Sequence, residues 1–183
     1  METIKLIKKF APIFVFHSKE THFPVNLETA EKQEFKENLC PEGPLYYTII
    51  HNGMSEMTVN YVLLFPKTYK GLFGYSSING DVKFIRMIFD TKKKTLKKIF
   101  YGNHLLQEFT LKTDRPRIYV SLETHNFYPM IFSQKNIFGV VSEETQNGLS
   151  WETTNTLVYQ PKKLKGKRYG DSKLIPYDFY ENI

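Results

Sequence analysis

The sequence predicts an all-β protein, an antiparallel β-sandwich with one or two short helices. Seven runs rich in Ile, Val, Tyr or Phe are each bounded by Gly, Pro, Asn or Asp, which is typical of strands. Aromatic residues make up 15% of the chain, with 12 Tyr beside 15 Phe, a composition that suits half-buried sheet. The spacing of the runs favours a sandwich.

The expected elements follow one another along the whole chain. The predicted strands are Ile13–Phe16, Leu45–Ile50, Thr58–Phe65, Phe84–Phe89, Leu96–Phe100, Arg117–Leu122 and Thr156–Tyr159. Between the first two, Leu27–Leu39 carries a narrow apolar stripe that predicts a short helix, which Pro41 and Gly43 would end. Hairpins are predicted at 51–54, where an Asn-Gly pair tolerates positive φ, and at 90–95.

Length and composition bound the class of protein. The 183 residues predict a single domain, 1–183, which can bury enough surface to need no metal or disulfide. The single cysteine, Cys40, excludes an intramolecular disulfide and is interpreted as a buried small hydrophobe. The sequence contains no signal-peptide pattern and no membrane-spanning run. We therefore expect an intracellular soluble protein, in a virion or in host cytoplasm or nucleus if the chain is viral.

Lysine clusters are the main charge feature of a chain whose net charge is +6. One cluster crowds the hairpin at 90–95, and another crowds an expected exposed loop at 161–173. The candidate phosphate-contacting residues are Lys92, Lys93, Lys94, Lys163, Lys165, Lys167 and Arg168. Either they form a solvated face, or they bind nucleic acid or an anionic membrane without reading sequence.

Several ordered blocks resemble the vacuolar protein sorting-associated protein sixty-two family. The blocks are Phe10-Ala11-Pro12 with 17–24, Leu45-Tyr46-Tyr47, 59–66, Gly80-Asp81, 117–129 and 147–151. That family is similar in its central motif to the necrosis-inducing cytolytic proteins, so the resemblance implies a β-sandwich.

The central motif departs from that pattern. In the family and its cytolytic relatives, carboxylates and a histidine gather round a divalent cation, but here Ile78 stands at the histidine position and Lys83 at the glutamate position. A lysine ammonium supplies a positive charge and no lone pair, so no metal or other cofactor is predicted. Asp81 is interpreted as a turn residue that caps the entrance of the next strand.

Four residues could form a remnant of the family site: Asp81, His104, His125 and Tyr128. His125 is interpreted as a structural histidine that bonds a nearby carbonyl. Two neutral imidazoles with Asp81 would be an alternative transition-metal site.

Three classes of function stay open. The first is a non-enzymatic structural or interaction protein that kept the scaffold, lost the cation site and associates with itself as a homodimer or with another protein. Composition and divergence suggest a large DNA virus as its source, with packaging in the particle. The second is binding of nucleic acid or an anionic membrane through the lysines. The third is a hydrolase with a rebuilt site of Asp81, His104 and His125, although no nucleophile elbow, phosphate loop or Cys-x-x-Cys is present.

Overall fold

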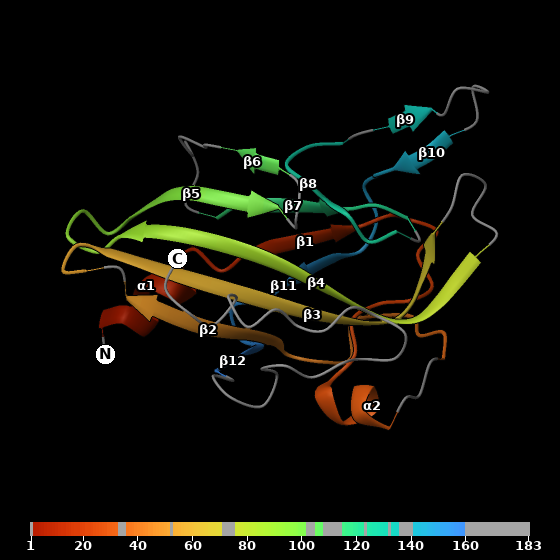
Figure 1. Cartoon of the computed structure of the whole chain (residues 1–183), viewed down its shortest axis with the longest axis horizontal. Helices are drawn as coiled ribbons and strands as arrows, with labels where there is room; N and C mark the ends of the chain where they lie inside the picture. Colours follow the sequence, from red (N-terminus) through yellow and green to blue (C-terminus); the bar gives the residue numbers. More distant parts are fainter. Residues whose placement is uncertain are drawn as a thin grey trace.

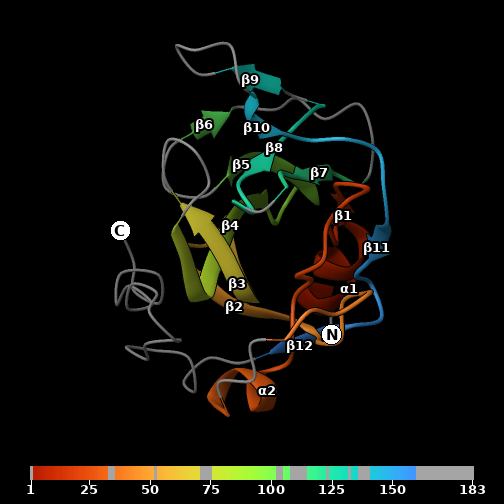
Figure 2. The ribbon, with the colours of Figure 1, turned by 90° about the vertical axis from the view of Figure 1, so that its right-hand side faces the viewer.

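The computed structural model describes most of the chain in two packed β-sheets. The described residues are 2–32, 36–51, 53–70, 76–101, 105–107, 115–122, 124–131, 133–135 and 141–159. Figure 2 shows the two layers end-on, with β2–β4 on one side and β1 and β11 on the other. The predicted β-sandwich is confirmed.

The larger sheet has six strands in the order β12-β2-β3-β4-β5-β6. Their bounds are Leu157–Tyr159 (β12), Leu45–His51 (β2), Glu56–Lys70 (β3), Ser76–Asp90 (β4), Thr95–Tyr101 (β5) and Leu105–Gln107 (β6). The long β3 and β4 pair antiparallel from Glu56↔Asp90 to Lys70↔Ser76 and form the centre of this sheet (Figure 1).

The smaller sheet has four strands in the order β11-β1-β7-β8. Their bounds are Ser150–Glu152 (β11), Ile13–Phe16 (β1), Arg117–Val120 (β7) and Phe127–Tyr128 (β8). β1 pairs parallel with β7, so two segments far apart in the sequence lie side by side in one layer. A separate pair is formed by β9 (Ser133–Lys135) and β10 (Val141–Glu144).

Side chains of alternating residues fill the space between the sheets. On β3, for example, Tyr61, Leu63 and Phe65 face this core, while Val62 and Leu64 face the outer side. The helix α1 (Glu2–Lys9) closes one end of the core with Leu6 and Ile7, and α2 (Leu27–Glu31) covers the outer face with Ala30. No described helix is long and apolar enough to cross a lipid bilayer.

The structure corrects several predicted elements. The helix predicted at Leu27–Leu39 ends at Glu31; Asn38 instead bonds the backbone of Phe23, and Leu39 is 93% exposed, so it is no part of an apolar stripe. The helix α1 was not predicted, and neither were β6, β8, β9, β10 and β11. The strand predicted at Thr58–Phe65 is longer, and the one predicted at Arg117–Leu122 ends at Val120.

Both predicted hairpins are confirmed. Gly53 adopts φ +80° between β2 and β3, and Lys94 adopts φ +55° between β4 and β5. The carboxylate of Asp90 accepts the backbone N–H groups of Lys92 and Lys93 and so fixes the second turn. Cys40 is exposed, so its interpretation as a buried hydrophobe was wrong; the segment around it lies on the surface after α2.

Candidate functional site

Ionisable side chains from both sheets converge on the ring of His125 at one end of the sandwich. Asp81 and Lys83 come from β4, Glu20 from the segment after β1, and His125 and Asn126 from the turn between β7 and β8. We call Glu20, Asp81, Lys83 and His125 the charge cluster. None of these three segments adjoins another in sequence, so the sandwich fold itself brings them together.

The turn between β7 and β8 holds His125 in an unusual backbone conformation. Its φ is +53°, in the left-handed region that non-glycine residues rarely adopt. The backbone N–H of His125 donates to the Ser121 carbonyl, and the Ser121 hydroxyl accepts the N–H of Asn126. The imidazole then lies flat on Phe65, with ring centroids 3.9 Å apart. The turn therefore fixes both the position and the plane of the imidazole.

Asp81 lies within β4, opposite Phe65 of β3. The preceding Gly80 adopts φ +75°, and both strands bend in this region (Figure 1). A side chain at position 80 would be strained by that φ, so the glycine is what allows the strand to turn here. The bend leaves the Asp81 carboxylate between a lysine and a histidine: Oδ2 is 3.3 Å from Lys83 Nζ and 3.9 Å from His125 Nδ1.

Lys83 and Glu20 complete the charge cluster on either side. The Lys83 ammonium also donates to Asn126 Oδ1 at 3.1 Å, so it joins β4 to the histidine turn. Glu20 Oε1 accepts the backbone N–H groups of Thr21 and His22 and lies 3.5 Å from His125 Nε2. Each ring nitrogen of His125 therefore faces a carboxylate.

The electrostatics of the charge cluster favour the charged forms. Burial by itself would lower the pKa of His125, but the carboxylates of Asp81 and Glu20 outweigh it, so the pKa is raised. Burial would raise the pKa of Asp81, but His125 and Lys83 outweigh it, so that pKa is lowered. A neutral imidazole has one N–H, whereas the imidazolium directs an N–H and its positive charge at both carboxylates. With His125 protonated, two negative and two positive charges balance.

Three members of the charge cluster are shielded from solvent. His125 is 0% exposed, Asp81 6% and Glu20 8%. A general base must reach the proton it removes from a substrate, and these groups instead face one another. Within the described ranges, no group of three His, Cys, Asp or Glu side chains is arranged to hold a metal ion.

The structure changes the interpretation of the predicted site residues. Asp81 is not a turn residue, because it lies inside a 15-residue strand. His125 was predicted to bond a nearby carbonyl, but its ring nitrogens face the carboxylates of Glu20 and Asp81 instead. Tyr128 is half-buried on β8, and His104 lies outside the described residues. Sequence reasoning missed Glu20 as a site residue, although it stands in the block 17–24 that carries part of the family resemblance.

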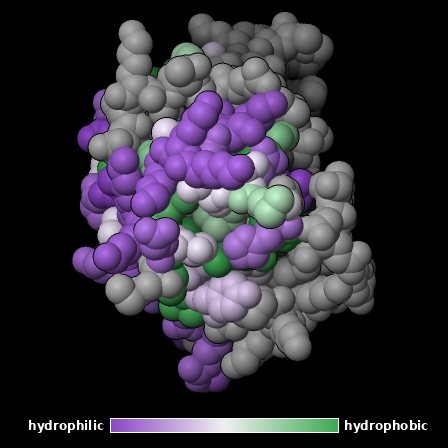
Figure 3. Space-filling view, turned by 90° about the vertical axis from the view of Figure 1, so that its left-hand side faces the viewer, coloured by the Kyte–Doolittle hydropathy of each residue, from purple (hydrophilic) through white to green (hydrophobic). Residues whose placement is uncertain are grey.

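The predicted lysine hairpin lies at the opposite end of the sandwich. Along β4, Asp90 is about 30 Å from Asp81 at the usual rise of a strand. There α1 lies beside the β4–β5 turn, and hydrophilic residues gather on this face of the molecule (Figure 3). The exposed Lys5 and Lys9 of α1 and Lys94 of the turn line one pocket. We define these six lysines as the basic end face: Lys5, Lys8, Lys9, Lys92, Lys93 and Lys94. The other candidate phosphate contacts, Lys163, Lys165, Lys167 and Arg168, lie outside the described residues.

Solved structures with the same fold are toxin-fold proteins of the necrosis- and ethylene-inducing-like (NLP) group. A structure described as NLPPya in complex with mannosamine matches with a TM-score of 0.54 at 10% identity, covering 94% of this chain and 83% of that chain. One described as a toxin fold for microbial attack and plant defense gives a TM-score of 0.53 at 10% identity, covering 95% and 84%. The non-toxic HaNLP3 protein gives 0.52 at 13% identity, covering 94% and 84%.

These likenesses show the fold and confirm the predicted similarity to necrosis-inducing proteins at the level of architecture. No family model matches the chain, and no curated protein does. The resemblance to the vacuolar sorting family therefore stays a prediction.

Proposed function

We propose that this protein is a non-enzymatic structural or interaction protein on a β-sandwich in which an internal lysine has taken the place of a bound cation. The Lys83–Asp81 pair is the observation that carries the proposal. Its ammonium lies 3.3 Å from the Asp81 carboxylate, with side chains only 17% and 9% exposed. An aspartate that is already neutralised from inside needs no external cation.

Two further features support a non-catalytic role. The four charges of the charge cluster balance, and the groups that could act as acid or base are shielded from solvent. Catalytic groups need access to a substrate, whereas this arrangement ties together β4, the segment after β1 and the β7–β8 turn. We infer that the charge cluster fixes the end of the scaffold and that partners bind the outside.

Divalent cations should leave the melting temperature of the wild-type protein unchanged. A divalent cation should stabilise the variant Lys83→Glu, because three carboxylates then surround His125. At a tenfold excess over Kd, a bound ion would stabilise that variant by about 1.4 kcal/mol, which raises its melting temperature by roughly 3–6 °C. Thermal melts in Ca²⁺, Mg²⁺ or EDTA measure the difference.

The double variant Lys83→Glu with Ile78→His also tests whether positions 78 and 83 correspond to the histidine and the glutamate of the family's central motif. If the wild-type protein itself is stabilised by Ca²⁺ or Mg²⁺, the internal lysine does not replace a cation, and the proposal is wrong. Lys97→Glu is the matched control, because it reverses the same charge on the exposed face of β5.

We further propose that the protein associates with itself as a homodimer, and that a viral particle is its setting. Open sheets of a sandwich offer edge strands for self-pairing. Size-exclusion chromatography with light scattering at near-physiological salt measures the mass directly. A monomeric mass at all concentrations would contradict self-association and direct the search to other protein partners.

A second candidate function is binding of polyanions by the basic end face, and the specific observation in its favour is the convergence of two lysine clusters. Lys5, Lys8 and Lys9 are some eighty residues from Lys92–Lys94 in sequence, yet α1 and the β4–β5 turn are joined by the Glu2–Lys94 ion pair, and Lys5, Lys9 and Lys94 line one pocket. A concentrated positive surface binds phosphates mainly through release of counterions.

Replacing both Lys92 and Lys93 with Gln should weaken binding of a DNA duplex. The slope of log K against log salt should fall by about two, because each lysine removed leaves one phosphate without its neutralising partner. Phosphatidylserine vesicles serve as a second polyanion in the same titration. The double variant Lys19→Gln/Lys32→Gln removes two exposed lysines away from this end and is the control. An equal slope in both double variants would exclude Lys92 and Lys93 as phosphate-binding residues.

A further inference from the structure

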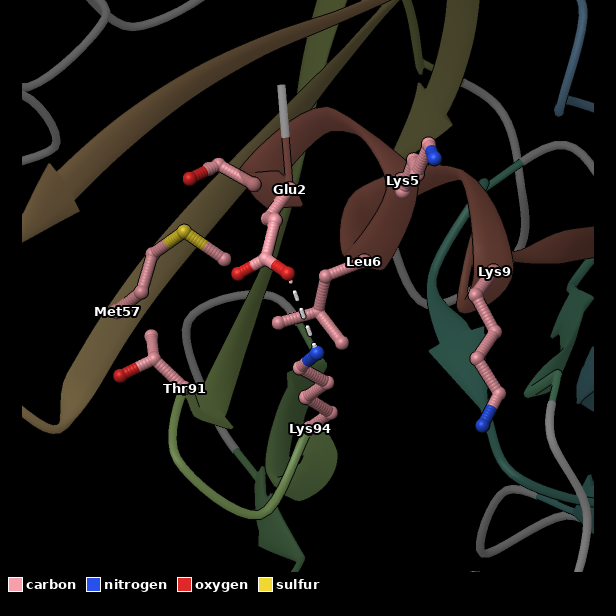
Figure 4. Close-up of a pocket in the computed structure, with 8 residues that line it drawn as sticks. Glu2, Lys5, Leu6, Lys9, Met57, Thr91 and Lys94 are labelled. Carbon is pink, nitrogen blue, oxygen red and sulfur yellow. Dashed lines mark hydrogen bonds and ion pairs between the residues drawn. The ribbon is translucent and has the colours of Figure 1, made fainter.

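A pocket opens in the basic end face, between α1, the start of β3 and the β4–β5 turn (Figure 4). Its volume is about 350 Å³, which lies within the range of small-ligand sites. Leu6, which is 9% exposed, and the fully buried Met57 lie at its base. The exposed lysines Lys5, Lys9 and Lys94 line it as well. The pocket thus combines an apolar interior with a positive rim.

A carboxylate of the chain itself already occupies the positive rim. Glu2 Oε1 lies 3.3 Å from Lys94 Nζ, and the two side chains point toward each other in Figure 4. They are 85% and 62% exposed, and ion pairs this exposed contribute little to stability. An incoming anion can therefore displace Glu2 from Lys94 at small cost. The Glu2 carboxylate shows that Lys94 binds an anionic oxygen at this position.

The backbone at Lys94 holds this lysine at the pocket. Its φ of +55° lies in the region where Gly or Asn would be favoured over Lys. The turn is anchored from below by Asp90, which accepts the N–H groups of Lys92 and Lys93. The ammonium is thus presented from a fixed turn.

We propose that this pocket binds a single-chain amphiphile with an anionic head, such as an alkyl phosphate or a fatty carboxylate. The head pairs with Lys94 in place of Glu2, and the chain lies against Leu6 and the methylene groups of the lining lysines. This inference deepens the second candidate function, on which it rests, by naming a ligand class for one part of the basic end face. The apolar lining distinguishes it from simple phosphate binding, which needs lysines alone.

Titration calorimetry with dodecyl phosphate below its micelle concentration tests the inference. The full chain should bind one equivalent, Lys94→Asn should weaken binding about fivefold, and Glu2→Gln should tighten it about threefold. Asn tolerates the positive φ of position 94, so the loss cannot be ascribed to a strained turn. The opposite signs of the two variants distinguish the pocket from a general effect of surface charge, and Lys32→Gln, at the end of α2, is the control for one lost charge.

Four results would overturn the inference. Equal affinities of Lys94→Asn and Lys32→Gln for dodecyl phosphate would show that Lys94 does not bind the ligand. Competition by inorganic phosphate at similar concentration would indicate an anion site without a chain-binding part. Equally tight binding of the neutral dodecyl maltoside would show that the pocket does not require an anionic head group. If dodecyl phosphate fails to bind while the duplex DNA titration keeps its dependence on Lys92 and Lys93, the pocket inference fails and the polyanion function stands.

Discussion

Replacing Lys83 with Met should lower the free energy of unfolding by about 3 kcal/mol, since removal of one partner from a buried ion pair leaves the other charge uncompensated. The Asp81 side chain is 9% exposed, and it would keep only the distant His125 nitrogen, 3.9 Å away, as a cationic partner. Two carboxylates would then share one imidazolium. Urea unfolding at neutral pH measures the loss.

The double variant Asp81→Asn/Lys83→Met separates charge from packing. It removes one charge of each sign and leaves His125 balanced by Glu20, so most of the lost stability should return. Lys97→Met is the surface control: its pair with Glu56 has side chains 43% and 31% exposed and should cost less than about 1 kcal/mol. If Lys83→Met costs no more than this control, the Lys83–Asp81 pair does not hold the cluster together.

The strands were predictable because their signals are local. Ile13–Phe16 was predicted with its observed bounds, since a proline precedes four β-branched or aromatic residues. The hairpin at 51–54 followed from an Asn-Gly pair. The helix α1 also has a local signal, because Leu6, Ile7 and Phe10 lie on one face of a helix, but the neighbouring lysines obscure the apolar pattern of so short a segment.

The candidate site was less predictable because its members meet through the fold. Asp81 and His125 were named from a resemblance, but their approach depends on the bend at Gly80 and on a turn with positive φ. The distance between Glu20 and His125 depends on the parallel pairing of β1 with β7, two strands that are far apart in the sequence. Likewise, the sequence shows two separate lysine clusters. They come together only because α1 lies beside the β4–β5 turn in the fold.

The stability of the protein should fall as the pH rises above about 6.5, the ordinary pKa of histidine. The pKa of His125 is raised in the folded protein, so its proton is bound more tightly there than in the unfolded chain. That contribution is complete below the unfolded pKa and is lost as the pH rises through the folded pKa. Each unit by which the pKa is raised contributes about 1.4 kcal/mol. Urea unfolding at a series of pH values measures the slope.

Other groups act in separate pH windows, which is what makes this prediction specific. The pKa of His22 is lowered by burial, so its contribution to stability changes with pH below 6.5 and in the opposite direction. The lowered pKa of Asp81 stabilises the fold above its unfolded value and is lost on acidification through the folded pKa. Above pH 6.5, the loss should therefore come from His125.

The variant His125→Asn keeps a residue that tolerates φ +53° and removes the titrating ring. It is expected to be less stable than the wild type at pH 6.5, because Glu20 and Asp81 lose their shared cation, and to show a flat profile between pH 6.5 and 9. Histidine proton resonances followed by NMR give an independent titration of the same group. A wild-type profile as flat as that of the variant would mean that His125 is neutral in the fold, and the charge balance of the cluster would then be wrong.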